Sequence, residues 1–357
     1  MATNVLVFCG SSYQLLVAIR IIEKFYHDDN IYLVLSDTIA NVQTIYENAV
    51  KEKYFKKVYL WKTKDVFLYN KAQKIRNALL GWKYSEKVMK NFEGSHKKYD
   101  VFLYSNISDI VMHTANVLFH RNNTLKLEMF EDGFSTYSDY IGNFMDPNNH
   151  KSHLLYHVFS KTSALYLFNP SLLSWKPIMK VCPIEPEFKH ECLELVNRLF
   201  SYNELHDDYN KKIIFFEESY AGDGKPIDDV DMIRPIAELV GKDNIMVKIH
   251  PRNETNRFCE EGYVTNQNTN IPWEVILLNE DFSESVFVSI ASNAAMNPFF
   301  LFGMKVPAAL LFRCTLYPDS LYKEIIEYDN AICSKYPEVF FIPDNKEDLL
   351  QWIKTKI

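Results

Sequence analysis

The sequence predicts an α/β fold with two doubly wound parallel-sheet domains. At 357 residues the chain is too long for one comfortable hydrophobic core. Short β-rich runs alternate with longer stretches whose apolar residues repeat at i+3 and i+4, as expected for parallel strands joined by helices. Apolar residues make up 47% of the chain, against 10 Gly and 14 Pro, so we expect an ordered chain with a sizeable core.

The first domain is assigned to residues 1–168. Its β-rich runs predict strands at 4–8, 31–35, 57–61, 101–104 and 124–130. Between them, period-3.6 patterns predict helices at 13–25, 38–53, 69–91 and 109–120. In the helix at 13–25, for example, apolar residues recur at positions 15, 16, 18, 19 and 22. This alternation indicates a parallel sheet covered on both faces.

A linker is predicted at residues 169–187, where Pro170, Pro177, Pro183 and Pro186 interrupt any packed element. The alternation resumes in a second domain at 188–357. We expect helices at 187–200, 228–240, 272–279, 293–302 and 319–328, strands at 212–217, 244–249, 286–290 and 305–312, and a strand and helix within 339–357. The last helix is a candidate to pack back on the first domain. Ligands of such open sheets bind at the carboxyl ends of the strands, so we expect a cleft between the two domains.

The net charge of −7 argues against a surface built for nucleic acid. Residues 51–98 nevertheless form a basic segment with 14 Lys or Arg against four acids, and eight aromatic residues from Tyr54 to Tyr84 interleave with the basic ones. That segment carries +10 and the remainder about −17. It is compatible with an anionic membrane surface or an anionic acceptor. The alternative is an ordinary solvated face with lysine stems lying over apolar residues.

The six cysteines include no C-x-x-C pair and no Cys/His spacing typical of a metal site, so we expect them to be reduced and buried. The N-terminus runs directly into an apolar strand without a basic region or cleavage site. We therefore expect a cytoplasmic protein without a membrane span, and peripheral association with the inner face of the cell membrane is compatible with the basic segment.

Two carboxylates follow the predicted strand at 124–130, in the run Glu131-Asp132-Gly133. Burial and mutual repulsion can separate the pKa values of adjacent carboxyls and leave one as a general base, while the glycine permits a tight turn. The alternative is a polar turn with solvated acids. The turn after the first strand carries Gly10, Ser11, Ser12 and Gln14, which suit the approach of a sugar or phosphate.

The strand at 244–249 ends abruptly at His250-Pro251, which places an imidazole at its tip between Lys248 and Arg252. Such a histidine can protonate a phosphate leaving group or hold it electrostatically. The alternative is a histidine hydrogen-bonded at a strand terminus.

The strand at 286–290 leads through small polar residues into a helix. Free backbone N–H groups there, with Ser289, Ser292 and Asn293, would bind a phosphate, although Ser292 also fits a plain N-cap. The loop that carries Glu218 and Gly222 faces the same predicted cleft but matches no glycine-rich phosphate motif. The D-x-D run at Asp229 falls where a helix begins, so we expect no metal site and no cofactor.

In their order and spacing, these motifs resemble those of the bacterial sialyltransferases of glycosyltransferase family 52 and of their relatives among bacterial sialyl- and polysialyltransferases. The matching residues are Glu131-Asp132-Gly133, His250-Pro251, and Ser289 with Ser292. The resemblance runs through most of the chain. It implies a GT-B architecture, in which two Rossmann-like domains face a central cleft.

The resemblance also implies an activity: inverting, metal-independent transfer of N-acetylneuraminic acid from its CMP conjugate to a hydroxyl of a terminal galactose or similar sugar. The acceptor would be a lipooligosaccharide or capsular polysaccharide. Glu131 would be the base with Asp132 supporting it, His250 would assist the departing phosphate, and Ser292, with Ser289, would hold it. A monophosphate leaves readily enough for a cationic side chain and a helix N-terminus to replace a metal.

Two other functions remain open at this point. The first is a GT-B hexosyltransferase, such as a glucosyltransferase, that uses a different nucleotide sugar. The second is a non-catalytic glycan-binding component of a surface-polysaccharide pathway, with the basic segment as its docking face. A homodimer is a possible assembly for any of the three.

Overall fold

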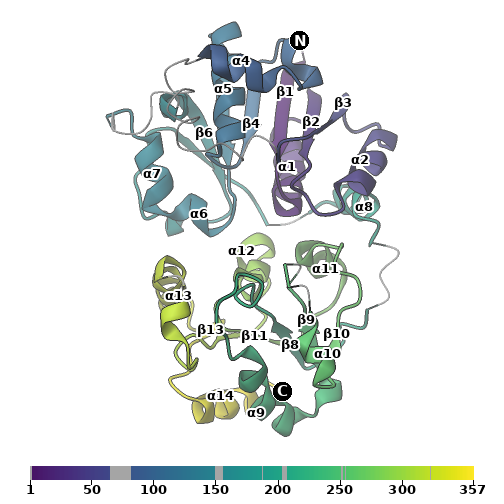
Figure 1. The fold of residues 1–357 in the computed structure, drawn as a ribbon, viewed down its shortest axis with the longest axis vertical. Coiled ribbons are helices and arrows are strands. Elements are labelled where there is room, and N and C mark those ends of the chain that lie inside the picture. The colour runs from purple at the N-terminus through teal and green to yellow at the C-terminus, as the bar shows by residue number, and fades with distance from the viewer. Residues whose placement is uncertain are drawn as a thin grey trace. The chain divides into compact units, whose positions relative to one another are not determined.

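The computed structural model describes residues 2–64, 82–148, 156–186, 188–202, 207–250, 252–253, 255–321 and 323–357. The chain divides into two compact units, Met1–Phe200 and Ser201–Ile357. Each unit contains one parallel β-sheet with helices packed on it (Figure 1). The predicted fold class is therefore confirmed.

Seven strands form the sheet of the first unit within its described residues, in the order β3-β2-β1-β4-β5-β6-β7, and all neighbours are parallel. The strands are β1 (Asn4–Cys9), β2 (Asn30–Ser36), β3 (Lys57–Trp61), β4 (Val101–Tyr104), β5 (Lys126–Phe130), β6 (Thr162–Leu167) and β7 (Lys180–Pro183). The strand order reverses between β1 and β4, which pair in register at Val5 and Val101. This reversal creates a topological switch point, where ligands of doubly wound sheets bind.

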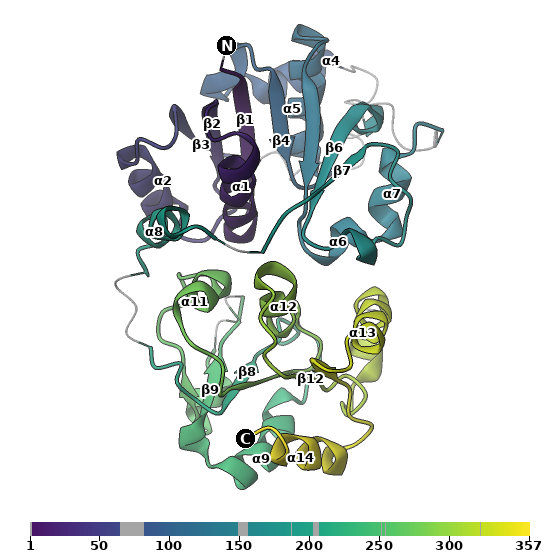
Figure 2. The same ribbon diagram turned by 180° about the vertical axis from the view of Figure 1, so that it is seen from behind.

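The helices of the first unit are α1 (Ser12–Phe25), α2 (Val42–Lys51), α4 (Trp82–Met89), α5 (Asp109–Arg121), α6 (Phe134–Tyr137), α7 (Asp139–Met145) and α8 (His190–Leu199). Figure 2 shows α1 in front of the sheet, with α5 on the opposite face. Apolar residues recur through α1 and are buried, and the Ser11 side chain caps its first turn. The sequence pattern therefore positions the start of α1 directly after β1.

The boundary between the units differs from the predicted linker. β7 lies inside the segment 169–187 and extends the first sheet, pairing with β6. Helix α8, which was assigned to the second domain, packs against α1 and α2 of the first unit through an apolar face that includes Leu195 and Val196. The first unit consequently ends at Phe200. β6 and β7 were not predicted, because their short runs carry no clear strand pattern.

Six strands form the sheet of the second unit within its described residues, in the order β10-β9-β8-β11-β12-β13, and all neighbours are parallel. They are β8 (Ile213–Phe216), β9 (Ile245–Lys248), β10 (Val264–Thr265), β11 (Val286–Ser289), β12 (Ala308–Leu310) and β13 (Phe340–Phe341). Here the order reverses between β8 and β11. The loops after these strands therefore meet at the equivalent switch point of the second sheet.

The helices of the second unit are α9 (Asp229–Val240), α10 (Arg257–Glu260), α11 (Trp273–Asn279), α12 (Asn297–Phe302), α13 (Lys323–Lys335) and α14 (Lys346–Lys354). The predicted helix at 293–302 is divided into a 3-10 turn, Asn293–Ala295, and α12, which begins with Pro298 near its start. The last helix, α14, contacts α9, and Figure 1 shows the two together, with α11 and α12 on the other face of the sheet.

In the basic segment, the described lysines are exposed but most of the described aromatic side chains are not. Phe55, Tyr59, Trp61 and Tyr84 are buried in the core. Tyr54 is 37% exposed. Phe67 and Tyr69 lie outside the described residues, as do residues 69–81 of the predicted helix at 69–91. Among the described residues of the segment, the interleaved aromatic pattern therefore mostly reflects side chains that pack inward, while the lysines lie on the surface.

All six cysteines lie in described segments and are free, as predicted. Four are buried, but Cys259 is exposed and Cys314 is partly exposed, which corrects the expectation that all are buried. Cys259 belongs to the four-residue helix α10, which has only Phe258 buried.

Candidate active site

The acid pair Glu131–Asp132 directly follows β5, at the edge where the strands of the first sheet end. Gly133 follows with φ of 67° and ψ of −151° and leads into α6. This backbone conformation is essentially restricted to glycine, because a Cβ atom would be strained there. The predicted tight turn is thus present, and it fixes the direction in which the chain leaves the acid pair.

Glu131 is 3% exposed, and its carboxylate accepts three hydrogen bonds. The Tyr13 hydroxyl donates to Oε1 at 2.8 Å. The Tyr137 hydroxyl and the backbone N–H of Phe168, the latter at 3.0 Å, donate to Oε2. Burial raises the pKa of Glu131, and the hydrogen bonds from Tyr137, Phe168 and Tyr13 oppose that rise. The carboxyl is therefore buried but well supplied with donors.

Asp132 is partly buried and is held by amide side chains. Nε2 of Gln14 donates to its Oδ1 at 2.9 Å, and Nδ2 of Asn106 donates to its Oδ2 at 3.4 Å. The Gln14 Oε1 atom accepts the backbone N–H of Gly10 at 2.6 Å. Burial raises the pKa of Asp132, and the two amides oppose the rise. The predicted residues Gly10, Gln14 and Asp132 are therefore joined in one network across the switch point.

The turn after β1 uses its polar groups inside the protein. Oγ of Ser11 accepts the N–H of Gln14 at 3.1 Å and caps α1. Gln14 is 3% exposed, while Ser12 and Tyr13 are partly exposed. Tyr13, Asn106 and Tyr137 were not among the predicted site residues. The contacts of Tyr13 and Asn106 with the acid pair span 118 and 26 positions, and no local pattern marks the Tyr137 hydroxyl as a partner of Glu131. The one available signal was their place just after predicted strands.

His250 lies two residues beyond β9 and is partly buried. Its backbone N–H donates to Glu217 at 2.9 Å, and its Nδ1 accepts the N–H of Arg252 at 3.2 Å. Burial, followed by the charge of Arg252, lowers the pKa of His250 to about 4. The free imidazole is therefore neutral near pH 7, with its proton on Nε2. Pro251, the other half of the motif, lies outside the described residues.

In the turn after β11, the backbone N–H groups of Ala291, Ser292 and Ala294, which were expected to be free, have acceptors inside the protein. Oε1 of Glu218 accepts the backbone N–H of Ala291 at 2.8 Å. Ser289 is fully buried, and its Oγ accepts the N–H of Ser292 at 3.0 Å. The Ser292 hydroxyl in turn caps the short 3-10 turn at Asn293–Ala295. The N-cap interpretation of Ser292 is thus correct, and a buried carboxylate occupies a position where an anion was expected.

Lys248 is the last residue of β9 and is 7% exposed. Among the described residues, its ammonium makes no hydrogen bond and no ion pair within 4.0 Å. Burial lowers its pKa to about 8, against the opposing charge of Glu274. Nδ2 of Asn297 holds Glu274 by donating to its Oε1 at 2.8 Å. Glu274 was not singled out in the sequence, where it appears as one acid at the start of an apolar helix.

Gly222 brings the loop after β8 against the turn after β9. Its N–H donates to Oδ1 of Asn253 at 2.9 Å, and a Cβ atom there would lie 2.8 Å from the carbonyl oxygen of Arg252. Arg252 pairs with Asp223 at 3.1 Å across the same junction. The predicted residues Gly222 and Arg252 therefore lie together beside His250, and only a glycine permits this close approach.

A buried group of acids lies behind these loops. Arg257 bridges Glu217 at 3.1 Å and Asp229 at 2.8 Å, so the D-x-D aspartate is an ion-pair partner. Asp329 of α13 is fully buried, and its carboxylate accepts no hydrogen bond from the described part of the chain. Burial, followed by the charge of Glu218, raises the pKa of Asp329 well above its usual value.

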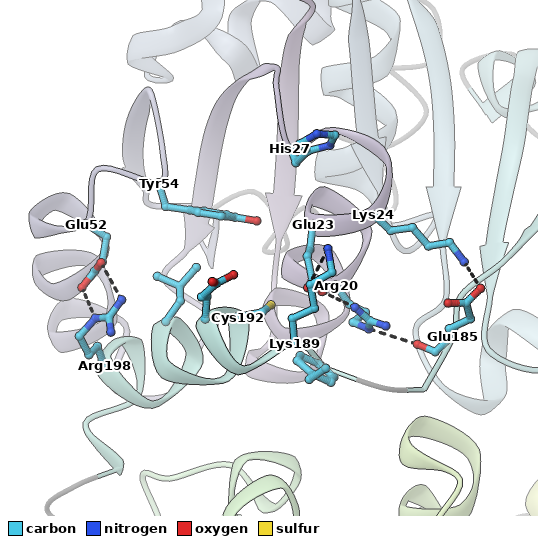
Figure 3. A pocket seen from close by; sticks show the side chains of 13 residues that line it. Arg20, Glu23, Lys24, His27, Glu52, Tyr54, Glu185, Lys189, Cys192 and Arg198 are labelled. Carbon is cyan, nitrogen blue, oxygen red and sulfur yellow. Dashed lines mark hydrogen bonds and ion pairs between the residues drawn. The ribbon is translucent and has the colours of Figure 1, made fainter.

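A separate groove of about 790 Å³ lies on the first unit between α1 and α8 (Figure 3). Its charged side chains mostly pair with one another. Lys24 contacts Glu185 at 2.7 Å, and Arg198 contacts Glu52 at 2.8 Å. The acid pair is not among its lining residues. Because its charges are already matched, the groove shows no preference for a polyanion.

No group of three or more His, Cys, Asp or Glu side chains in the described segments is arranged to hold a metal ion. No helix in those segments is long and apolar enough to cross a bilayer. Whether the reaction needs a metal stays a prediction.

Solved structures that share this fold include the following three. A UDP-N-acetylglucosamine 2-epimerase has a TM-score of 0.54 at 12% identity, over 99% of this chain and 87% of that one. The alpha/beta-galactoside alpha-2,3-sialyltransferase of Photobacterium phosphoreum has a TM-score of 0.53 at 9% identity, over 96% and 99%. Arabidopsis thaliana UGT89C1, complexed with UDP-L-rhamnose, has a TM-score of 0.52 at 10% identity, over 100% and 89%. At these identities the similarity concerns the fold alone.

Two successive Rossmann-like units with these structural neighbours define a glycosyltransferase fold of the GT-B class. Residues 5–309 match the alpha-2,8-polysialyltransferase family, and the chain belongs to that family. The predicted relationship with sialyl- and polysialyltransferases is thereby confirmed, while membership of family 52 stays a prediction. A comparison with the sequences of curated proteins found no match.

Proposed function

We propose that this protein is an inverting sialyltransferase that uses CMP-N-acetylneuraminic acid and needs no metal. The observation that carries the proposal is the family match over residues 5–309, which spans both the acid pair and His250. The chemistry of these residues supports it, because a carboxylate and an imidazole are suitable as general base and leaving-group partner.

In this proposal Glu131 is the base, and Asp132 supports it. The acceptor hydroxyl gives its proton to Glu131, and its oxygen forms a bond to the anomeric carbon of the sialyl residue. The bond from that carbon to the phosphate oxygen breaks, and its electron pair leaves with CMP. Attack on the face opposite the phosphate inverts the configuration. The raised pKa of Glu131 suits a base that must take up a proton.

His250 meets the CMP phosphate in this proposal, with Arg252 and Lys248 adding positive charge to the site. A neutral imidazole with its proton on Nε2 can donate a hydrogen bond to the phosphate at once. A bound phosphate dianion would also raise the pKa of His250, because opposite charges favour the protonated ring. We assign Ser292 and Asn293 to the edge of the phosphate site, since both are partly exposed, and Ser289 to its support.

The acceptor is proposed to be a glycan of the bacterial surface, such as lipooligosaccharide or capsular polysaccharide. The sequence motifs favour a terminal galactose-type hydroxyl. The family match favours a second candidate, a terminal sialyl residue, because the family is described as transferring in alpha-2,8 linkage to form a polymer. Lysines of the basic segment would hold the enzyme at an anionic membrane on the cytoplasmic side.

A donor panel tests the proposed function. Purified protein is incubated with CMP-N-acetylneuraminic acid or with UDP-hexoses, in the presence of a chelator, and release of CMP or UDP is measured. We expect release of CMP alone. Consumption of a UDP-hexose instead would establish the hexosyltransferase. No consumption of any donor, with binding of glycans retained, would establish the non-catalytic binding component.

A further inference from the structure

We infer that Tyr13 and Tyr137 form a clamp that orients the Glu131 carboxylate as a proton acceptor. The inference rests on the proposed role of Glu131 as the base. Both tyrosines are positioning residues in this account, since they act on the substrate through Glu131. We call the arrangement Tyr13–Glu131–Tyr137 the tyrosine clamp.

Two of the hydrogen bonds at Glu131 have a defined direction. The Phe168 N–H can only donate, and it reaches Oε2 of Glu131 at 3.0 Å. The Tyr137 hydroxyl accepts the N–H of Asn169 at 3.3 Å, so its own proton is directed to the same carboxylate oxygen. Donors on both carboxylate oxygens favour the ionised form over the protonated form. The tyrosine clamp thus opposes the rise in the pKa of Glu131 that burial causes.

The three donors to Glu131 come from separate segments of the chain. Tyr13 lies at the start of α1 after β1, Tyr137 ends α6 after β5, and Phe168 follows β6. The carboxylate is therefore fixed by segments that follow three different strands. A group held from three directions has little freedom to rotate, as an efficient base requires.

The two tyrosines differ in exposure. Tyr137 is 4% exposed, whereas Tyr13 is partly exposed. Of the two tyrosines, Tyr13 is therefore the one whose side an acceptor sugar can reach. The titratable groups that face Glu131 are these two tyrosines and Asp132, whose charge raises the pKa of Glu131. The tyrosine clamp lowers the pKa of Glu131, and the charge of Asp132 raises it.

The test compares Tyr137→Phe and Tyr13→Phe with the matched control Tyr26→Phe. Tyr26 also donates to a buried glutamate of β5, Glu128, but it does not contact the acid pair. The pKa of Glu131 is measured without substrate, by infrared difference spectra or ¹³C NMR referenced to Glu131→Gln. Transfer rates from pH 4 to 8 give the acidic limb of kcat and the KM for acceptor.

We expect each clamp variant to raise the pKa of Glu131 by about one unit. We expect the acidic limb of kcat to move upward by the same amount. At pH values below that limb kcat should therefore fall about tenfold, since one pKa unit is a tenfold change in the ionised population there. Tyr26→Phe should change none of these. An unchanged Glu131 pKa in Tyr137→Phe or Tyr13→Phe, or an equal shift in Tyr26→Phe, would overturn the clamp.

The two readouts separate the clamp from the proposed function. If the wild type transfers no sialic acid, the proposed function fails, and the substrate-free pKa measurement still decides whether the clamp exists. If Tyr137→Phe does not fold, Tyr13→Phe decides alone, because a partly exposed hydroxyl is removed there without opening the core.

Discussion

The buried carboxyl group of Glu218 accepts the backbone N–H of Ala291 at 2.8 Å, so an internal acidic side chain occupies the turn after β11. Burial raises the pKa of Glu218 to about 7. A carboxyl whose folded-state pKa lies above its usual value of 4.5 stabilises the fold relative to its ionised form only while protonated. That contribution is complete below pH 4.5 and is lost as the pH rises through 7.

Glu218→Gln should therefore flatten the pH dependence of stability. The wild type should lose about 3 kcal/mol of unfolding free energy between pH 5 and 8.5, since one pKa unit corresponds to about 1.4 kcal/mol. Glutamine keeps an acceptor for Ala291 and removes the titration. Urea unfolding at several pH values measures both proteins. Parallel pH profiles for the two would contradict the prediction.

Asp329→Asn should stabilise the protein at neutral pH. The fully buried Asp329 has no hydrogen-bond donor among the described residues, so its ionised form is costly and an amide removes that charge. We expect the unfolding free energy to rise by about 1–3 kcal/mol at pH 8. The exposed Asp319 provides a control, because Asp319→Asn should stay within about 0.5 kcal/mol. Thermal unfolding of both variants decides the point.

CMP binding should draw a proton onto His250. In the free protein its pKa is about 4, so the ring is neutral at pH 6.5, and a bound phosphate raises that pKa. Titration calorimetry in buffers of different ionisation enthalpy should show proton uptake by the wild type and none by His250→Gln. The exposed His190 supplies the control His190→Gln, which should keep the uptake. Binding without uptake in the wild type would show that His250 does not meet the phosphate.

Gly133→Ala should destabilise the first unit, although no atom lies within 4 Å of the added Cβ. The penalty is the backbone conformation, which we expect to cost about 1–3 kcal/mol. Gly142→Ala should act by a different mechanism, because its Cβ would lie 2.7 Å from the Trp175 side chain. Tryptophan fluorescence should therefore change in Gly142→Ala and not in Gly133→Ala. An equal fluorescence change in both would contradict this distinction.

Replacing Lys51, Lys53 and Lys56 by glutamine should weaken binding to vesicles that contain anionic lipid. All three lysines are exposed, and each contributes about 1 kcal/mol near a charged bilayer. We expect a loss of about 100-fold at low salt, less at high salt, and no change with neutral vesicles. Unchanged binding to anionic vesicles would contradict a membrane role and show that the basic segment is an ordinary solvated face.

The fold was predictable where the periodicity was strong. β3 and β4 have the predicted bounds, and α1 differs by one residue, because buried parallel strands and amphipathic helices leave clear patterns. β7 was missed because its four residues end in Pro183 and lie in a proline-rich stretch. The sequence also did not predict that α8 packs on the first unit, because an apolar helical face shows that a helix packs against something but not against which element.

At the candidate site, the sequence indicated that Glu131 and Asp132 follow a strand, but not what surrounds them. Tyr13 reaches Glu131 across 118 positions, and only the folded chain brings them together. In the second unit, the side chain of Glu218 fills the turn whose N–H groups were expected to be free. A local sequence motif predicts a backbone turn well. Whether the N–H groups of that turn are free to bind a ligand depends on tertiary contacts, which the motif does not show.

The most direct test of the central claim is transfer of sialic acid by purified protein in the presence of a chelator. The reaction contains CMP-N-acetylneuraminic acid and two acceptors, one ending in galactose and one in a sialyl residue, and the product is identified by mass. We predict a product larger by one or more sialyl residues, and a rate at least 100-fold lower for folded Glu131→Gln. Absence of any sialylated product, or full activity of Glu131→Gln, would contradict the account.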